Sequence, residues 1–165
     1  MKNKGEILAS VLNNFSDCYF LLHNTREFVV VENIMSEGFV FESQLPHTTD
    51  HINPNDPIEI TYFLIQRKDY GNYTVIIAIP GNIYDAYSEA AIKNDLTFEE
   101  VITASEPYYS ENDELVFTLS QKHVLGYFNL KSEEFYRNIN WDPFFNNCLY
   151  RTPSKRLQNN GKKNC

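Results

Sequence analysis

The fold of this chain is decided by residues 58–79, which read IEITYFLIQRKDYGNYTVIIAI. Apolar residues recur at every second position from 58 to 64, which is typical of a strand with one buried face. Residues 73–79 form a run rich in β-branched side chains, which also favours a strand. The polar connection between them contains a glycine turn signal. This stretch therefore predicts two strands, at residues 58–65 and 73–79.

Helices and further strands are predicted on both sides of this stretch. Apolar residues spaced three and four apart predict helices, and continuous apolar runs predict buried strands. The expected helices cover residues 6–15, 26–37, 83–93 and 98–103, and the other expected strands cover 17–23, 39–41, 114–120 and 123–130. Gly38 is expected to end the second helix and Thr97 to begin the last. The final two strands are expected to form a pair joined by a tight turn.

The irregular order of strands and helices predicts an α+β fold rather than a doubly wound parallel sheet. The proline-containing segment 43–57 is expected to be a surface loop. No Gly-x-Gly-x-x-Gly and no Gly-Lys-Ser/Thr follows any expected strand, so the sequence predicts neither a Rossmann nor a P-loop phosphate site.

The composition predicts one folded domain followed by a short basic tail. Of the 165 residues, 42% are hydrophobic and 22% are charged, which is typical of a soluble globular domain. Residues 151–165 hold five of the 14 Lys and Arg residues and no acid, so residues 1–150 hold nine bases against 22 acids, a charge of -13. We expect a single domain over residues 1–150, whose charge disfavours nonspecific nucleic-acid binding, and a disordered tail at 151–165.

Cysteine and histidine usage predicts no metal centre. The three cysteines are widely spaced and form no Cys-x-x-Cys pair, so neither a disulfide framework nor a zinc site is expected. His47, Asp50 and His51 could hold a metal ion, but no second ligand pair stands at a known spacing from them. No signal peptide and no membrane span are expected, which predicts a cytoplasmic protein without a membrane partner.

Three side chains stand within or beside apolar segments where packing does not require them: His23, Tyr62 and Glu114. Each alone has a structural explanation. A histidine after a strand is most often structural, a tyrosine on a strand is usually part of the core, and an acid is usually solvated.

The neighbours of these residues resemble the poly(ADP-ribose) polymerase-like catalytic domain of the His-Tyr-Glu class at three places. LLHNTR at 21–26, with IMSEGF at 34–39, is similar to the family's strand ending in His-Gly-Ser/Thr and its following Ile-Leu-x-x-Gly-Leu. ITYF at 60–63 is similar to Gly-Ile-Tyr-Phe, and the Asn-Tyr pair at 72–73 follows at the family's spacing. DELVF at 113–117 is similar to the family's Asn-Glu-Tyr-x-Val-Tyr. The three motifs occur in the family's order.

The resemblance implies an ADP-ribosyltransferase-like split β-sandwich of two mostly antiparallel sheets with flanking helices and an NAD cleft. His23 would bind the adenine-side ribose, and the backbone of Asn24 would bind the nicotinamide carboxamide. Tyr73 would stack on the nicotinamide ring, with Tyr62 on its other side. Glu114 would stabilise the oxocarbenium-like sugar and take a proton from the acceptor. The implied catalytic residues are Glu114, Tyr62 and His23, and the implied NAD contacts are His23, Asn24, Thr25, Tyr62, Tyr70 and Tyr73.

The expected function is therefore transfer of ADP-ribose, as a single unit, from NAD to a protein, nucleic acid or small molecule, by a toxin, effector or defence protein. The chain departs from the family at Asn24 and Ile60, where the family has glycines, and at Tyr70, where it has serine. Three alternatives remain open: an inactive module that binds NAD, ADP-ribose or a protein, an NAD glycohydrolase, and a structural domain whose resemblance is coincidental. The bases expected to help an anionic dinucleotide bind are Arg26, Arg67 and Lys68.

Overall fold

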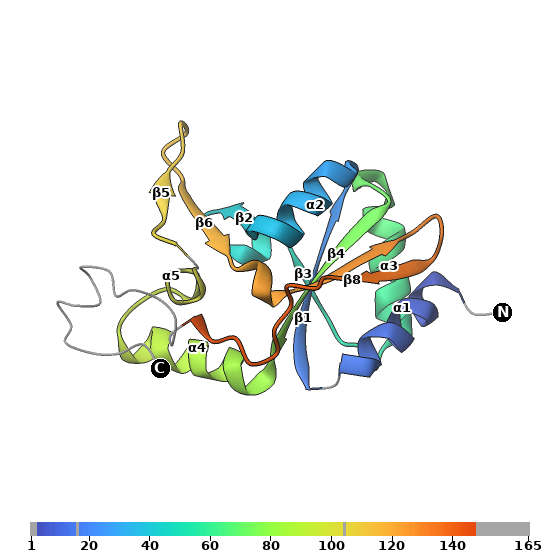
Figure 1. Cartoon of the computed structure of the whole chain (residues 1–165), viewed down its shortest axis with the longest axis horizontal. Helices are drawn as coiled ribbons and strands as arrows, with labels where there is room; N and C mark the ends of the chain where they lie inside the picture. Colours follow the sequence, from blue (N-terminus) through green and yellow to red (C-terminus); the bar gives the residue numbers. More distant parts are fainter. Residues whose placement is uncertain (1–2, 16, 104, 148–165) are drawn as a thin grey trace.

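The computed structural model describes residues 3–15, 17–103 and 105–147. It shows the predicted α+β class: two antiparallel sheets flanked by helices (Figure 1). The five-stranded sheet has the order β3-β1-β4-β7-β8, and the three-stranded sheet has the order β2-β6-β5. The strands are β1 (Cys18–Thr25), β2 (Phe39–Glu42), β3 (Asp50–Ile52), β4 (Tyr73–Pro80), β5 (Tyr108–Tyr109), β6 (Leu115–Leu119), β7 (Val124–Asn129) and β8 (Glu134–Arg137).

Five α-helices and four short 3-10 turns are described between these strands. The helices are α1 (Lys4–Leu12), α2 (Phe28–Glu37), α3 (Pro57–Arg67), α4 (Gly81–Lys93) and α5 (Phe98–Ile102), and the turns are η1 (Asn13–Phe15), η2 (Leu45–His47), η3 (Lys68–Tyr70) and η4 (Gln121–His123). Both predicted caps are confirmed. Thr97 forms a capping box with Glu100 at the start of α5, and Gly38 ends α2 with a φ of 107°.

The five-stranded sheet is buried on both faces because each face carries its own apolar core. Phe20 and Leu22 of β1 face a core that α1 and α3 cover, and Leu21 between them faces a second core. That second core is shared with the three-stranded sheet, α2, α4 and α5, and includes Phe41 and Phe117. The two sheets therefore share one apolar core.

The strand predicted at residues 58–65 is wrong, because this segment lies within helix α3. Asp56 caps the helix by accepting a hydrogen bond from the backbone N–H of Glu59, and Pro57 occupies the first turn. The buried residues Ile60, Phe63 and Leu64 are spaced three and four apart and pack against α1 and β1. Burial of one helical face therefore decided the structure of this segment, although its apolar residues also alternate as they would in a strand.

The pairing predicted for the last two strands is also wrong, although both strands exist. β6 belongs to the three-stranded sheet and β7 to the five-stranded sheet, and η4 carries the chain from one sheet to the other. The loop predicted at residues 43–57 contains β3, which pairs with β1. β5 and β8 were not predicted, and the basic tail lies outside the described residues. Among the described helices, none is long and apolar enough to cross a membrane.

Candidate functional site

Strand β1 leaves one backbone edge open at its end, and a cavity lies beside that edge. β4 pairs with the whole of β1, from Cys18 opposite Pro80 to Thr25 opposite Tyr73. β3 pairs with the other edge only from Phe20 to Leu22. No described strand covers that edge over residues 23–25, so backbone groups there can meet a ligand. The cavity has a volume of about 260 Å³ and is lined by residues of β1, the η2–β3 segment, α3 and η3.

His23 offers this cavity a neutral imidazole in a defined tautomer. Its Nδ1 lies 2.7 Å from the carbonyl oxygen of Thr48. Because a carbonyl can only accept, Nδ1 carries the hydrogen and donates it. Burial lowers the pKa of His23, so the ring is neutral at pH 7 and its Nε2 is an acceptor. His23 can therefore accept a hydrogen bond from a ligand hydroxyl group.

The side chain of Asn24 has a structural role that sequence reasoning missed. Its Nδ2 donates to the carbonyls of Arg67 and Gly71, at 3.2 and 3.3 Å, and its Oδ1 accepts from the hydroxyl of Thr74. These bonds tie the end of α3 to β1. Gly71 has a φ of 135°, and a Cβ there would stand 2.0 Å from the Thr25 carbonyl oxygen. Only glycine allows this close approach, which holds η3 against the cavity.

One of the three expected bases lines the cavity. Arg67 donates to both carboxylate oxygens of Asp50, at 3.1 and 3.3 Å, and this bonding raises the pKa of Arg67. Its guanidinium also lies 5.7 Å from the centre of the Tyr70 ring, and Tyr70 is another lining residue. Arg26 donates to the carbonyl of Asp69. Lys68 lines a different hollow, between α1 and α3.

Glu114 comes from the other sheet, where it is exposed at the end of the turn that joins β5 to β6. Its carboxylate accepts from the hydroxyl of Ser43 at 3.3 Å. The side chain of Glu42 lies close by, and its proximity to Glu114 raises the pKa of Glu42. Glu114 lines a hollow of about 360 Å³.

His23 and Glu114 line two different hollows. Thr48 lines both the His23 cavity and a hollow of about 620 Å³ on the outer face of the three-stranded sheet. Tyr109 lines this second hollow and also the one beside Glu114, which includes Leu115 and Phe117 on the inner face of the same sheet. The convergence of His23 and Glu114 on one NAD molecule therefore stays a prediction. Thr48 and Tyr109 were not singled out in the sequence. A backbone carbonyl such as that of Thr48 leaves no sequence signal, because any residue supplies one.

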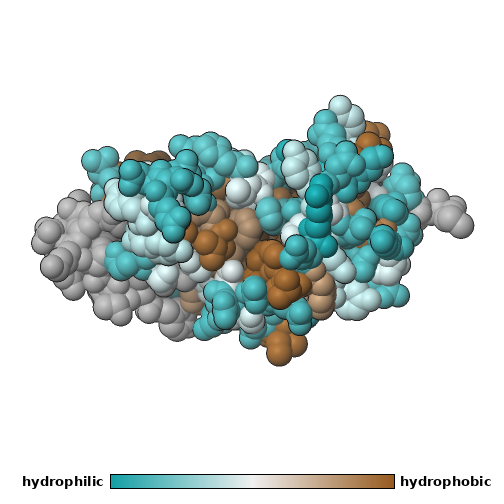
Figure 2. Space-filling model, turned by 90° about the horizontal axis from the view of Figure 1, so that it is seen from above, coloured by the Kyte–Doolittle hydropathy of each residue, from teal (hydrophilic) through white to brown (hydrophobic). Residues whose placement is uncertain are grey.

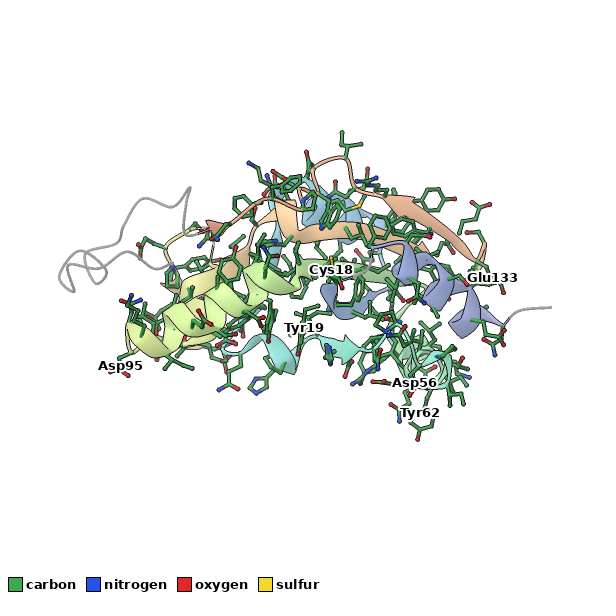
Figure 3. The ribbon with its side chains drawn as sticks, turned by 90° about the horizontal axis from the view of Figure 1, so that it is seen from below. Cys18, Tyr19, Asp56, Tyr62, Asp95 and Glu133 are labelled. Atoms are coloured by element: carbon green, nitrogen blue, oxygen red, sulfur yellow. The ribbon has the colours of Figure 1, made fainter. Side chains whose placement is uncertain are left out.

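The structure does not place Tyr62 and Tyr73 around a common ring site. Tyr62 is 62% exposed on α3 and points away from the molecule (Figure 3). Tyr73 begins β4 and packs under α2, with ring centres 5.6 Å from Phe28 and 6.0 Å from Tyr127. Neither lines any of the cavities described above. Tyr62 therefore lies on a helix rather than on the expected strand, and the stacking of the two tyrosines around nicotinamide stays a prediction.

The remaining expected residues lie at the open edge or outside it. Thr25 ends β1 opposite Tyr73, and Tyr70 is 59% exposed.

Within the described ranges, no group of three or more His, Cys, Asp or Glu side chains could hold a metal ion. Comparison of the chain with protein-family models, curated proteins and solved structures finds no match. The resemblance to the polymerase-like domain therefore rests on the three sequence motifs.

Proposed function

We propose that this chain is an NAD-dependent ADP-ribosyltransferase with a split β-sandwich of the ADP-ribosyltransferase type. The observation that carries the proposal is the neutral His23 beside the open edge of β1, in a cavity that Arg67 and Tyr70 also line. The sharing of one core by two antiparallel sheets supports the fold assignment.

NAD has groups that match the lining of the His23 cavity. A ribose hydroxyl can donate to His23 Nε2, and the nicotinamide carboxamide can pair with the open backbone edge at Asn24. Tyr70 supplies the exposed ring on which nicotinamide stacks, in place of Tyr62 and Tyr73. Arg67 provides positive charge for the pyrophosphate in a body that is otherwise acidic.

The reaction breaks the bond between the ribose C1′ and the nicotinamide nitrogen. The electron pair leaves with nicotinamide, and the sugar becomes an oxocarbenium ion that the acceptor attacks. The acceptor's proton passes to the Glu114 carboxylate, whose negative charge also stabilises the cation. The neighbouring carboxyl group of Glu42 adds negative potential at this point.

One observation favours a second candidate function, an inactive module that binds NAD or ADP-ribose. The tyrosine of the His-Tyr-Glu set lies outside the His23 cavity and Glu114 lines a different hollow, so one of the three expected catalytic residues lines that cavity. A binding module would take up NAD without releasing nicotinamide. An NAD glycohydrolase would release nicotinamide with water as the acceptor.

The test is nicotinamide release from NAD by the full chain, with and without cell lysate as acceptor. We expect Glu114→Gln to lower release at least about a hundredfold, since one charge-stabilising group contributes that much. Tyr62→Phe serves as the matched control and should change release less than twofold. NAD binding without release would select the binding module, and the absence of both would overturn the proposal.

A further inference from the structure

The outer face of the three-stranded sheet carries a hollow of about 620 Å³. Val40 and Val116 line it from the sheet, and Tyr108 and Tyr109 line it from β5. These two tyrosines are 58% and 69% exposed, and Val40 is 55% exposed. Figure 2 looks down on the molecule from above and shows apolar residues near its middle amid hydrophilic surface. Exposed apolar surface in a hollow is typical of an interaction site.

The charge of this hollow is entirely negative. Glu42 and Glu111 line it, and Glu114 stands in the adjoining hollow. None of its described lining residues is a lysine, arginine or histidine. The carboxyl groups of Glu42 and Glu114 lie close together. A cationic occupant would neutralise this charge.

The size of the site selects a peptide chain rather than a small ion. The hollow has a volume of about 620 Å³ and its lining runs from Val40 and Glu42 of β2, past Val116 of β6, to Tyr108 of β5. An extended peptide lying across this face would turn every second side chain toward it. Cationic side chains would then meet Glu42 and Glu111, and a guanidinium group would also stack on an exposed tyrosine ring.

We propose that this hollow, the β5 groove, binds an extended arginine-rich peptide segment of a partner protein. The groove is defined by Val40, Glu42, Tyr108, Tyr109, Glu111 and Val116. One consequence rests on the proposed transferase function: a peptide bound there would present an acceptor side chain to Glu114. The binding itself needs neither NAD nor catalysis.

The experiment measures the fluorescence anisotropy of labelled octapeptides titrated with the full chain in the absence of NAD. The probes are (Arg-Leu)4, (Lys-Leu)4 and (Glu-Leu)4. The groove variant carries Glu42→Lys and Glu111→Lys. The control variant carries the same charge change at Glu59 and Glu133, two exposed acids outside the groove; Figure 3 labels Glu133 on the turn between β7 and β8. A single Tyr109→Ser variant tests the groove if the double variant does not fold.

We expect the groove variant to weaken (Arg-Leu)4 binding at least tenfold and the control variant less than twofold. (Lys-Leu)4 should bind about threefold more weakly than (Arg-Leu)4, because lysine stacks less well on tyrosine. Equal weakening by both variants would show nonspecific attraction to an acidic protein and overturn the proposal, as would equal binding of (Glu-Leu)4. Peptide binding without nicotinamide release would leave this inference intact while the proposed function fails.

Discussion

His123 makes the stability of this fold depend on pH, and the size of the effect follows from its surroundings. The side chain is fully buried, its Nε2 lies 2.8 Å from the Tyr87 hydroxyl, and its Nδ1 has no hydrogen-bond partner within the described residues. Burial lowers the pKa of His123 from 6.5 to about 4, and Asp142 offsets only part of that shift. The folded protein therefore keeps this ring neutral when an unfolded chain would protonate it.

Lowering the pH reduces the free energy of unfolding. Above pH 6.5 the ring is neutral in both states, and between pH 6.5 and about 4 only the unfolded state takes up the proton. Linkage over these two pKa values predicts that lowering the pH from 7 to 5 costs about 2 kcal/mol of unfolding free energy through His123 alone. His23, whose pKa is also lowered, adds a loss in the same direction.

The assay is urea unfolding followed by the fluorescence of Trp141, at pH 7 and pH 5, for the wild type and His123→Gln. The difference between the two pH values should be about 2 kcal/mol larger in the wild type, because the contributions of His23 and of the carboxylates cancel in this comparison. His47→Gln, at an exposed histidine, should retain the full wild-type difference. An equal loss of unfolding free energy between pH 7 and pH 5 in the wild type and His123→Gln would refute the assignment of this pH dependence to His123.

Three further substitutions test local features of the fold and site. Gly71→Ala should lower the unfolding free energy by more than about 1 kcal/mol in a urea titration, because the added Cβ meets the Thr25 carbonyl at positive φ, whereas Asn72→Ala should cost less than about 0.5 kcal/mol. Thr97→Ala should cost about 1 kcal/mol through loss of the α5 cap, and an unchanged urea midpoint would contradict the role of the capping box. Tyr62→Ser should leave both the urea midpoint and the KM for NAD unchanged within about twofold, since the side chain is largely exposed; a clear rise in KM would return Tyr62 to the site.

The sequence predicted those elements whose signals are local. Strands β1 and β4, helices α2 and α4 and both named caps follow from apolar runs, helical spacing and capping residues within a few positions. The strand predicted at residues 58–65, which lie in α3, was wrong because the apolar residues there fit both the two-residue period of a strand and the three- and four-residue spacing of a helix. The Asp56-Pro57 pair with Glu59 two positions later is a helix-start signal that could have decided the case.

The site was predictable only where a residue's own chemistry identifies it. His23 and Glu114 are titratable side chains beside apolar strands, and each lines a hollow. The Thr48 carbonyl that sets the His23 tautomer lies 25 residues away, and Tyr109 lines two hollows through tertiary packing alone. Neither has a local pattern that could have identified it.

The crossing between β6 and β7 is what places His23 and Glu114 in different sheets. A hairpin of these strands would have placed Glu114 in the five-stranded sheet, beside the strand that carries His23 rather than on the facing sheet. Asn138 holds the crossing in place: its buried Nδ2 lies 3.0 Å from the carbonyls of Met35 and Val124 and 3.4 Å from that of Gln121. One amide thus ties α2, η4 and β7 together. The separation of the sheets, on which the proposed site depends, therefore rests on a buried polar contact that no apolar period reveals.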